Sequence, residues 1–274
     1  MWDINLWSVF MLILGNIVGS FLNVCIVRLP NEKSVVTPRS HCIHCQKPIP
    51  WYDNIPLVSF LLLKGQCRFC KGKISWRYPF VEFVTGLTFF LLFNHFGRVG
   101  VLIPYLVMYS CFIVALFVDF AHRIIPDEVS VGGMLCGLVF SLVIPELHGI
   151  QVDPNRMLIS HFHSLGMSAL GVLIGGGAIY AMGILGDFLF KKESMGGGDI
   201  KLLAMIGAFL GWKLAILTFF IAPFFGAVYG IAEKIRTKDT AIAYGPFLVL
   251  GAMISMFWGD LLIAWIMSGY GVYQ

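Results

Sequence analysis

The chain has 274 residues, of which 58% are hydrophobic and only 12% charged, and its mean hydropathy is +0.83. Soluble domains carry roughly one quarter charged residues, so this composition excludes a soluble globular protein and favours one that lipid surrounds. The net charge is +4, and the positions of the positive residues are more informative than their sum.

The first apolar segment, residues 4–27, contains no charged side chain. It is long enough to span a membrane, because ~20 residues cross the hydrocarbon core. The start of the chain, Met1-Trp2-Asp3, lacks the basic region of a signal peptide, and the apolar run continues too far for a cleaved one. We therefore expect this segment to stay as a membrane anchor.

Residues 28–78 have a different composition, with nine Lys or Arg, two acids, four of the seven cysteines and frequent prolines. So short a segment cannot build much of a hydrophobic core by itself. We expect an extramembrane module here.

Apolar segments then resume, and with the first they make eight candidate spans. The other seven are 79–97, 99–118, 129–145, 160–186, 200–212, 214–232 and 241–267, with 200–212 the shortest. The sequence thus predicts an all-α polytopic membrane protein of about eight transmembrane helices. Its expected parts are an anchor (1–27), a small module (28–78) and a membrane domain of about seven helices (79–274).

The distribution of Lys and Arg predicts the orientation of these spans, because cytoplasmic loops carry an excess of both. If the 28–78 module is cytoplasmic and eight spans alternate, 16 of the 19 positive residues lie on the cytoplasmic side. The exceptions are Arg98, Arg156 and Lys213. Both termini are then outside, and the module is cytoplasmic.

This topology brings two acids to the same membrane face, because Asp119 ends the third span and Asp199 begins the sixth. Two neighbouring carboxylates cannot both ionise easily, so one keeps a proton while the pair activates a water molecule between them. The helix dipole favours Asp199 as the ionised partner. The alternative is that both acids are only helix-terminal caps.

Asp199 follows three glycines in Met195-Gly196-Gly197-Gly198-Asp199-Ile200-Lys201. Glycine permits unusual backbone angles and close approach of a peptide, so Gly196 and Gly198 are expected to support the site. The segment lacks the context of a phosphate-binding loop.

Three charged residues near these acids have supporting roles in this interpretation. Asp127, which follows Pro126, is expected to cap the fourth span. Lys201 is expected to extend to the membrane interface rather than to pair with Asp199. Glu82 lies just inside the second span, where an ionisable residue is a functional candidate.

The cysteines of the module form two pairs, Cys42-x-x-Cys45 and Cys67-x-x-Cys70, with 21 residues between them. This pattern is typical of a structural zinc site of four thiolates, which would stabilise a module with little core. Two disulfides are the alternative, but disulfides are rare in the cytoplasm. His41 and His44 flank the first pair as less favoured ligands.

Motifs spread along most of the chain resemble those of the bacterial type IV prepilin peptidases. They include Gly19-Ser20-Phe21-Leu22-Asn23-Val24, the paired cysteines with Asn54-Ile55-Pro56 between them, Ile125-Pro126-Asp127, Gly196-x-Gly198-Asp199-x-Lys201 and Tyr244-Gly245-Pro246-Phe247. The one small departure is Gly197, where many members have methionine. Some members also lack the cysteines, so the activity does not require zinc.

The resemblance implies that Asp119 and Asp199 are the catalytic pair of an aspartic-type endopeptidase in the bacterial inner membrane. It implies cleavage of prepilins or type II secretion pseudopilins after the glycine of a short basic leader, at the cytoplasmic face. It also implies N-methylation of the new N-terminus with S-adenosylmethionine. The residues that bind this methyl donor cannot be identified from the sequence, although the 28–78 module with Glu82 is the best candidate neighbourhood.

Other functions remain open at this stage. The acids could belong to an ion-coupled transporter, although transporter sites usually lie near the membrane midplane. A non-catalytic scaffold for pilus assembly is a further alternative. We expect no nucleic-acid partner, and the sequence does not indicate an oligomeric state.

Overall fold

The computed structural model describes residues 5–97, 100–191, 195–237 and 243–269. Within these ranges the protein is all-helical, and the remaining regular structure is two isolated β-bridges. Met1-Trp2-Asp3, where we expected an uncleaved start, lies outside the described residues. Three of the positive residues used to predict the orientation, Arg98, Lys192 and Lys238, also lie outside the described residues.

The chain forms two compact units, residues 1–117 and 118–274. The first unit holds α1 (Leu6–Arg28), the four-cysteine segment, α3 (Arg77–Phe96) and most of α4 (Leu102–His122). The second unit starts with the last turn of α4 and continues through α5 (Asp127–Val143), α6 (Met157–Phe190), α7 (Gly197–Thr237) and α8 (Gly245–Gly269). Whether 28–78 is a domain of its own remains a prediction.

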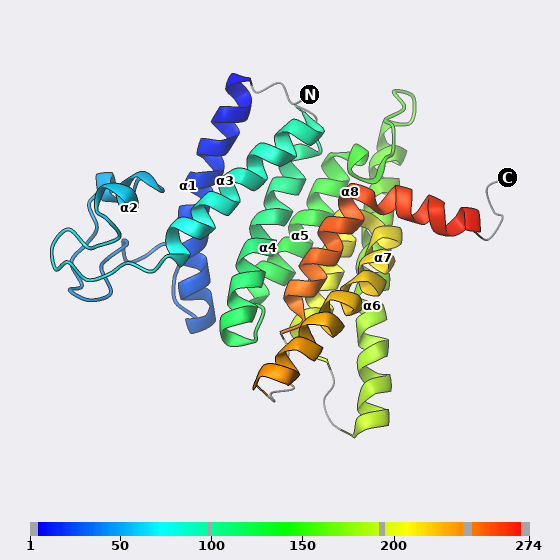
Figure 1. Ribbon diagram of the computed structural model, residues 1–274. Coiled ribbons are helices and arrows are strands. Elements are labelled where there is room, and N and C mark those ends of the chain that lie inside the picture. Colours follow the sequence, from blue (N-terminus) through cyan, green and yellow to red (C-terminus); the bar gives the residue numbers. More distant parts are fainter. Residues whose placement is uncertain (1–4, 98–99, 192–194, 238–242, 270–274) are drawn as a thin grey trace. The chain divides into compact units, whose positions relative to one another are not determined.

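In the first unit, α1 and α3 pack side by side (Figure 1). The start of α1 is capped by Asn5, whose side chain accepts a hydrogen bond from the Ser8 N–H at 3.0 Å. The two helices touch through small residues, since a Cβ on Gly15 would lie 2.8 Å from the Gly86 Cα. Such contacts are a common basis of helix association in membranes.

Between α1 and α3 the chain forms three short helical segments around the cysteine loops. They are η1 (Leu29–Asn31), η2 (Trp51–Asn54) and α2 (Val58–Leu62). Their exposed surfaces include aromatic and aliphatic side chains, such as Trp51, Leu61 and Leu62.

In the second unit, α6 and α7 approach each other very closely at two glycines, Gly171 and Gly207. A Cβ on either Gly171 or Gly207 would collide with the backbone of the other residue. Ser168 adds a polar contact at the same crossing, because its hydroxyl donates to the Ala208 carbonyl oxygen at 2.7 Å. This crossing fixes the helix whose first turn carries Asp199.

The helix α7 folds back on itself at Gly211, where the backbone is not helical (φ 77°, ψ 171°). A Cβ on Gly175 of α6 would lie within 3.5 Å of both the Leu203 carbonyl oxygen and the Ala215 side chain. In a straight helix those two residues would be ~18 Å apart, so the chain reverses between them. Figure 1 draws the two parts of α7 in yellow and orange.

Within the described residues, all eight expected apolar segments are mainly helical, with 200–212 and 214–232 forming the two arms of α7. Six of the described helices are long and apolar enough to cross a membrane, when α7 is counted as one. The 17-residue α5 is shorter than these six. The protein is thus a multi-pass membrane protein, as the composition indicated.

Candidate active site and four-cysteine centre

Asp119 lies in the last turn of α4 and is only 5% exposed. Its Oδ2 accepts a hydrogen bond of 3.0 Å from the backbone N–H of Gly245, the first residue of α8. The free N–H groups and the dipole of a helix N-terminus favour an anion at this position. This contact could not be predicted from the sequence, although Pro246 marks the start of a helix.

Asp199 lies in the first turn of α7 and is half-buried. It is close enough to Asp119 for the charges of the two carboxylates to interact. Both acids belong to the second unit, so the pair predicted from the topology is present in one compact part of the protein. Because Asp119 contacts the N-terminus of α8 and Asp199 lies in the first turn of α7, the dipole argument does not single out Asp199 as the ionised partner.

Ile125 lies between the start of α7, which carries Asp199, and the start of α8, which contacts Asp119. It is 8% exposed, and its side chain lies beside both Gly198 and Gly245. A Cβ would approach Ile125 to 3.1 Å at either glycine, and at Gly245 it would also lie 2.7 Å from the Asp119 Oδ2. The absence of side chains at Gly198 and Gly245 therefore lets the helix starts converge on the acids.

The glycine run before Asp199 acts through space and not through unusual backbone angles. In the described chain the glycines with positive φ are Gly65, Gly97, Gly149 and Gly211, and those of 196–198 are not among them. A Cβ on Gly196 would lie 3.2 Å from the Asp199 Oδ2, whereas one on Gly197 would meet nothing within 4 Å. Gly196 therefore leaves room beside the carboxylate.

Asp127 and Lys201 form an ion pair, with the Lys201 Nζ 2.6 Å from Oδ1 and 2.9 Å from Oδ2 of Asp127. Asp127 is the first residue of α5, and Pro126 occupies the capping position without a side-chain bond. The predicted capping role of Asp127 was therefore wrong. The pair connects the first turns of α5 and α7.

Tyr244, just before α8, adds a hydroxyl near the pair. Burial, together with the charge of Asp199, raises the pKa of Tyr244 to about 12. The phenol therefore remains a hydrogen-bond donor at neutral pH. The sequence motif contains Tyr244, but its proximity to Asp199 follows only from the tertiary structure.

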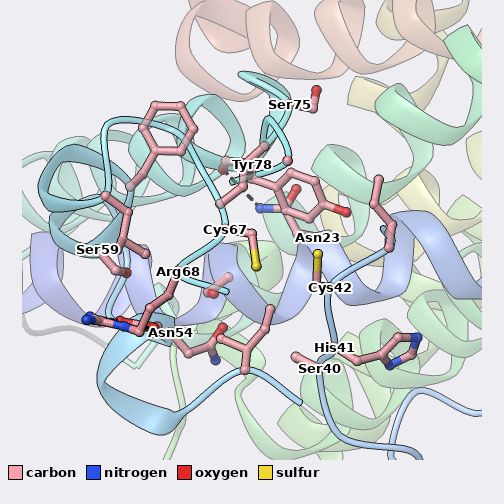
Figure 2. Close-up of a pocket in the computed structure, with 18 of the residues that line it drawn as sticks. Asn23, Ser40, His41, Cys42, Asn54, Ser59, Cys67, Arg68, Ser75 and Tyr78 are labelled. Carbon is pink, nitrogen blue, oxygen red and sulfur yellow. Dashed lines mark hydrogen bonds and ion pairs between the residues drawn. The ribbon is translucent and has the colours of Figure 1, made fainter. Parts of the chain in front are cut away.

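In the first unit, the thiol sulfurs of Cys42, Cys45, Cys67 and Cys70 all lie within 4.8 Å of one another. Four thiolates at Zn–S distances of ~2.3 Å form a tetrahedron with S···S edges of ~3.8 Å. The Sγ atoms of Cys42 and Cys70 are 3.8 Å apart, and the side chains of Cys42 and Cys67 point toward each other in Figure 2. The four residues fit a tetrahedral metal ion, and all are free thiols.

The two cysteine loops have the same backbone design. Cys42 N–H donates to the Lys47 carbonyl at 3.0 Å, and Cys67 N–H donates to the Gly72 carbonyl at 2.9 Å. The backbone N–H groups of Cys70 and Phe69 lower the pKa of Cys67 to about 6. The loops thus favour a thiolate, which is the form that binds metal.

The two histidines beside the cysteines have other partners. His41 Nδ1 lies 3.1 Å from the Arg39 carbonyl oxygen, and His44 Nε2 lies 3.4 Å from that of Lys73. Neither belongs to the metal-binding group among the described residues.

Glu82 is 8% exposed and lies in the first unit, apart from the two aspartates in sequence and in compact unit. Its Oε2 accepts a hydrogen bond of 2.9 Å from the Leu57 N–H, and the Ser20 hydroxyl also binds the carboxylate. Glu82 therefore joins α1, α2 and α3.

Two family models match the chain. The Bacterial Peptidase A24 N-terminal domain matches residues 13–96, and the Type IV leader peptidase family matches residues 106–231. The second match includes both aspartates, and the first includes the four cysteines and Glu82. No solved structure matches the chain.

Curated relatives match over most of the chain. A Prepilin leader peptidase/N-methyltransferase of Myxococcus xanthus is 39% identical over 85% of this chain and 64% of its own length. Proteins of the same name from Legionella pneumophila and Stutzerimonas stutzeri are 32% and 33% identical, over 90% and 92% of this chain and 90% and 91% of their own lengths. The chain therefore belongs to the type IV leader peptidase family.

Proposed function

We propose that the protein cleaves the leader peptides of type IV prepilins or type II secretion pseudopilins after a glycine and methylates the new N-terminus. The family match and the names of the relatives support both activities. The observation that carries the peptidase assignment is the convergence of Asp119 and Asp199, from distant parts of the sequence, on two helix N-termini.

The proposed peptidase reaction uses the two carboxylates in complementary protonation states. The ionised carboxylate takes a proton from a water molecule, and the resulting hydroxide attacks the carbonyl carbon of the scissile peptide bond. The protonated carboxylate hydrogen-bonds to the carbonyl oxygen, where negative charge develops. A proton then passes to the leaving nitrogen, and the peptide bond breaks.

The surroundings of the pair support this reaction. The Gly245 N–H holds Asp119 in one orientation, and the space beside Gly196 gives an extended substrate backbone access to Asp199. An extended peptide suits such a site, since its backbone carbonyls are accessible between side chains. The Tyr244 hydroxyl is a further donor near Asp199.

We also propose a structural zinc ion at Cys42, Cys45, Cys67 and Cys70, and S-adenosylmethionine as the methyl donor. Four thiolates would leave zinc no open coordination position, so the ion would hold the loops and take no part in the chemistry. The methyl donor supplies an electrophilic methyl group on a sulfonium. The protein would lie in the bacterial inner membrane with the cysteine segment cytoplasmic and both termini outside.

The decisive experiment uses the full chain, purified in detergent, with a prepilin as substrate and mass spectrometry of the products. Asp119→Asn and Asp199→Asn should each abolish leader removal. Asp260→Asn is the matched control, because Asp260 is an exposed acid on α8 of the same unit. Cleavage that survives either substitution at Asp119 or Asp199 would refute the catalytic assignment, and a wild-type protein that never cleaves would favour the scaffold or transporter alternatives.

A further inference from the structure

The first unit contains a cavity of about 270 Å³ between the cysteine loops and the facing ends of α1 and α3 (Figure 2). Its size is close to the lower end of the ~300–1,000 Å³ range of small-molecule sites. All of its lining residues lie between Ser20 and Glu82, so it belongs to the first unit and includes neither aspartate.

Two buried hydrogen-bond acceptors line this cavity. Glu82 is 8% exposed, and Asn23 is 2% exposed. The amide nitrogen of Asn23 donates to the Tyr78 carbonyl at 3.0 Å, a bond drawn as a dashed line in Figure 2, and to the Gly19 carbonyl at 3.3 Å. Because both of these partners are acceptors, the atom that contacts them is the amide nitrogen. The amide oxygen, Asn23 Oδ1, is then buried and has no hydrogen-bond partner in the described structure.

The Glu82 carboxylate likewise lacks a counter-charge among the described residues, since its recorded partners are the neutral Leu57 N–H and Ser20 hydroxyl. The nearby arginines of the cavity are engaged elsewhere. Arg28 donates to the carbonyl oxygens of Ser34 and Pro38, and Arg68 forms an ion pair with Asp53 at 2.6 Å. A buried charge without a partner is costly, so this carboxylate is suited to a cationic ligand.

The other carboxylate of the cavity, Asp53, is already neutralised. The side-chain hydrogen bond from Arg68 lowers the pKa of Asp53. Glu82 is therefore the acid that is available to a ligand, and with the Asn23 Oδ1 it presents acceptors only. An ammonium group, which has three N–H donors and no acceptor, matches this pair.

We propose that this cavity is the methyl-transfer site, in which Glu82 and Asn23 bind the N-terminal amine of the cleaved substrate. The proposal rests on the proposed function, because it assigns a place to the second of the two activities. The lining includes Phe60, whose aromatic ring suits a nucleoside, and Lys73, which provides positive charge for a carboxylate. Lys47 also lines the cavity, and its Nζ lies over the Phe69 ring, 5.1 Å from the centroid. The cavity thus offers groups complementary to each part of S-adenosylmethionine.

The charges balance in this reaction. An N-terminal amine has a pKa of about 7.7–8.0, so it arrives largely as an ammonium and must lose a proton to expose its lone pair. Glu82 accepts that proton. The nitrogen then forms a bond to the methyl carbon as the carbon–sulfur bond breaks, and the electron pair of that bond neutralises the sulfonium. The product is a secondary ammonium, and Glu82 returns its proton to solvent.

The cavity also gives the cysteine centre a defined role. Cys42 and Cys67 line it together with residues of both loops, so a metal ion would hold the wall that the methyl donor contacts. Metal loss should then impair methylation and leave peptide cleavage in the second unit intact.

The test uses a synthetic peptide that begins with the mature N-terminus, so that methylation is measured without prior cleavage. Glu82→Gln keeps the size of the side chain and an acceptor for the Leu57 N–H but removes the charge. We expect Glu82→Gln to lose methylation by at least ~100-fold, as for removal of a general base, while leader cleavage and zinc content stay at wild-type levels. Glu32→Gln is the matched control, because Glu32 is an exposed acid of the same unit outside the cavity.

A binding measurement provides a second readout. In titration calorimetry, wild-type protein should bind the free-amine peptide more tightly than its N-acetylated form, and Glu82→Gln should abolish the difference. S-adenosylhomocysteine, which has a neutral sulfur, should bind both proteins equally. Normal methylation by Glu82→Gln, or an equal loss of S-adenosylhomocysteine binding, would overturn the proposal. Failure of wild-type cleavage, with the peptide results as expected, would instead refute only the peptidase function.

Discussion

The substitution Gly245→Ala tests how α8 holds Asp119, one of the two proposed catalytic acids. The new Cβ would lie 2.7 Å from the Asp119 Oδ2 and 3.1 Å from the Ile125 Cδ1. Both distances are too short for ordinary contact, so the carboxylate must leave the Gly245 N–H or the start of α8 must shift. In either case the 3.0 Å hydrogen bond to Asp119 is lost or weakened.

The size of the effect follows from that bond. A hydrogen bond to a charged group contributes about 1.5–3 kcal/mol. Since about 1.4 kcal/mol corresponds to a tenfold change in rate, we expect kcat for leader cleavage to fall by roughly 10- to 150-fold. Methylation of a precut peptide should be unchanged, because the proposed methyl-transfer cavity belongs to the other unit.

The assay is the initial rate of prepilin cleavage in detergent, followed by mass spectrometry over a range of substrate concentrations. Gly197→Ala is the matched control, because a Cβ there would meet nothing within 4 Å, and it should cleave at the wild-type rate. The reasoning is refuted if Gly245→Ala cleaves as fast as Gly197→Ala, or if it impairs both activities equally.

Three further predictions concern other parts of the protein. The Asp127–Lys201 pair has side chains that are 64% and 44% exposed, so it should contribute no more than about 1 kcal/mol to stability. Lys201→Met and Asp127→Asn should therefore lower Tm only slightly, and the double variant should be no less stable than either; a large loss of Tm would contradict this. Gly207→Val should lower Tm strongly, because α6 and α7 would have to separate at Gly171, and a wild-type Tm would show that this crossing is not close. In metal-free protein the pKa of Cys67 is about 6, so its thiolate fraction, and with it the rate of alkylation by iodoacetamide, should rise as pH increases through that value and level off above it. Peptide mapping measures this rate, and a midpoint near the ordinary thiol value of about 8.5 would disprove it.

Local composition was sufficient to predict much of the architecture. In the part of the chain that the structure describes, the eight apolar segments are mainly helical, because a chain in lipid must satisfy its backbone hydrogen bonds within each segment. The four cysteines were predicted correctly as one cluster, since each C-x-x-C loop closes through its own short-range backbone hydrogen bonds. The closeness of Asp119 and Asp199 agrees with a sequence-based prediction, because the bias of Lys and Arg predicted both helix ends at one face.

The contacts that shape the site were decided by the tertiary structure. They include the Gly245 N–H on Asp119, Ile125 between the two helix starts, and Lys201 on Asp127. The same holds for the unpaired Asn23 oxygen and for the Glu82 carboxylate, which has no counter-charge in the described part of the cavity. Each depends on the rotation and depth of one helix against another, which the packing of small residues such as Gly171 and Gly207 sets. Hydropathy determines that a segment spans the membrane, but it does not determine which of its side chains meet a neighbouring helix.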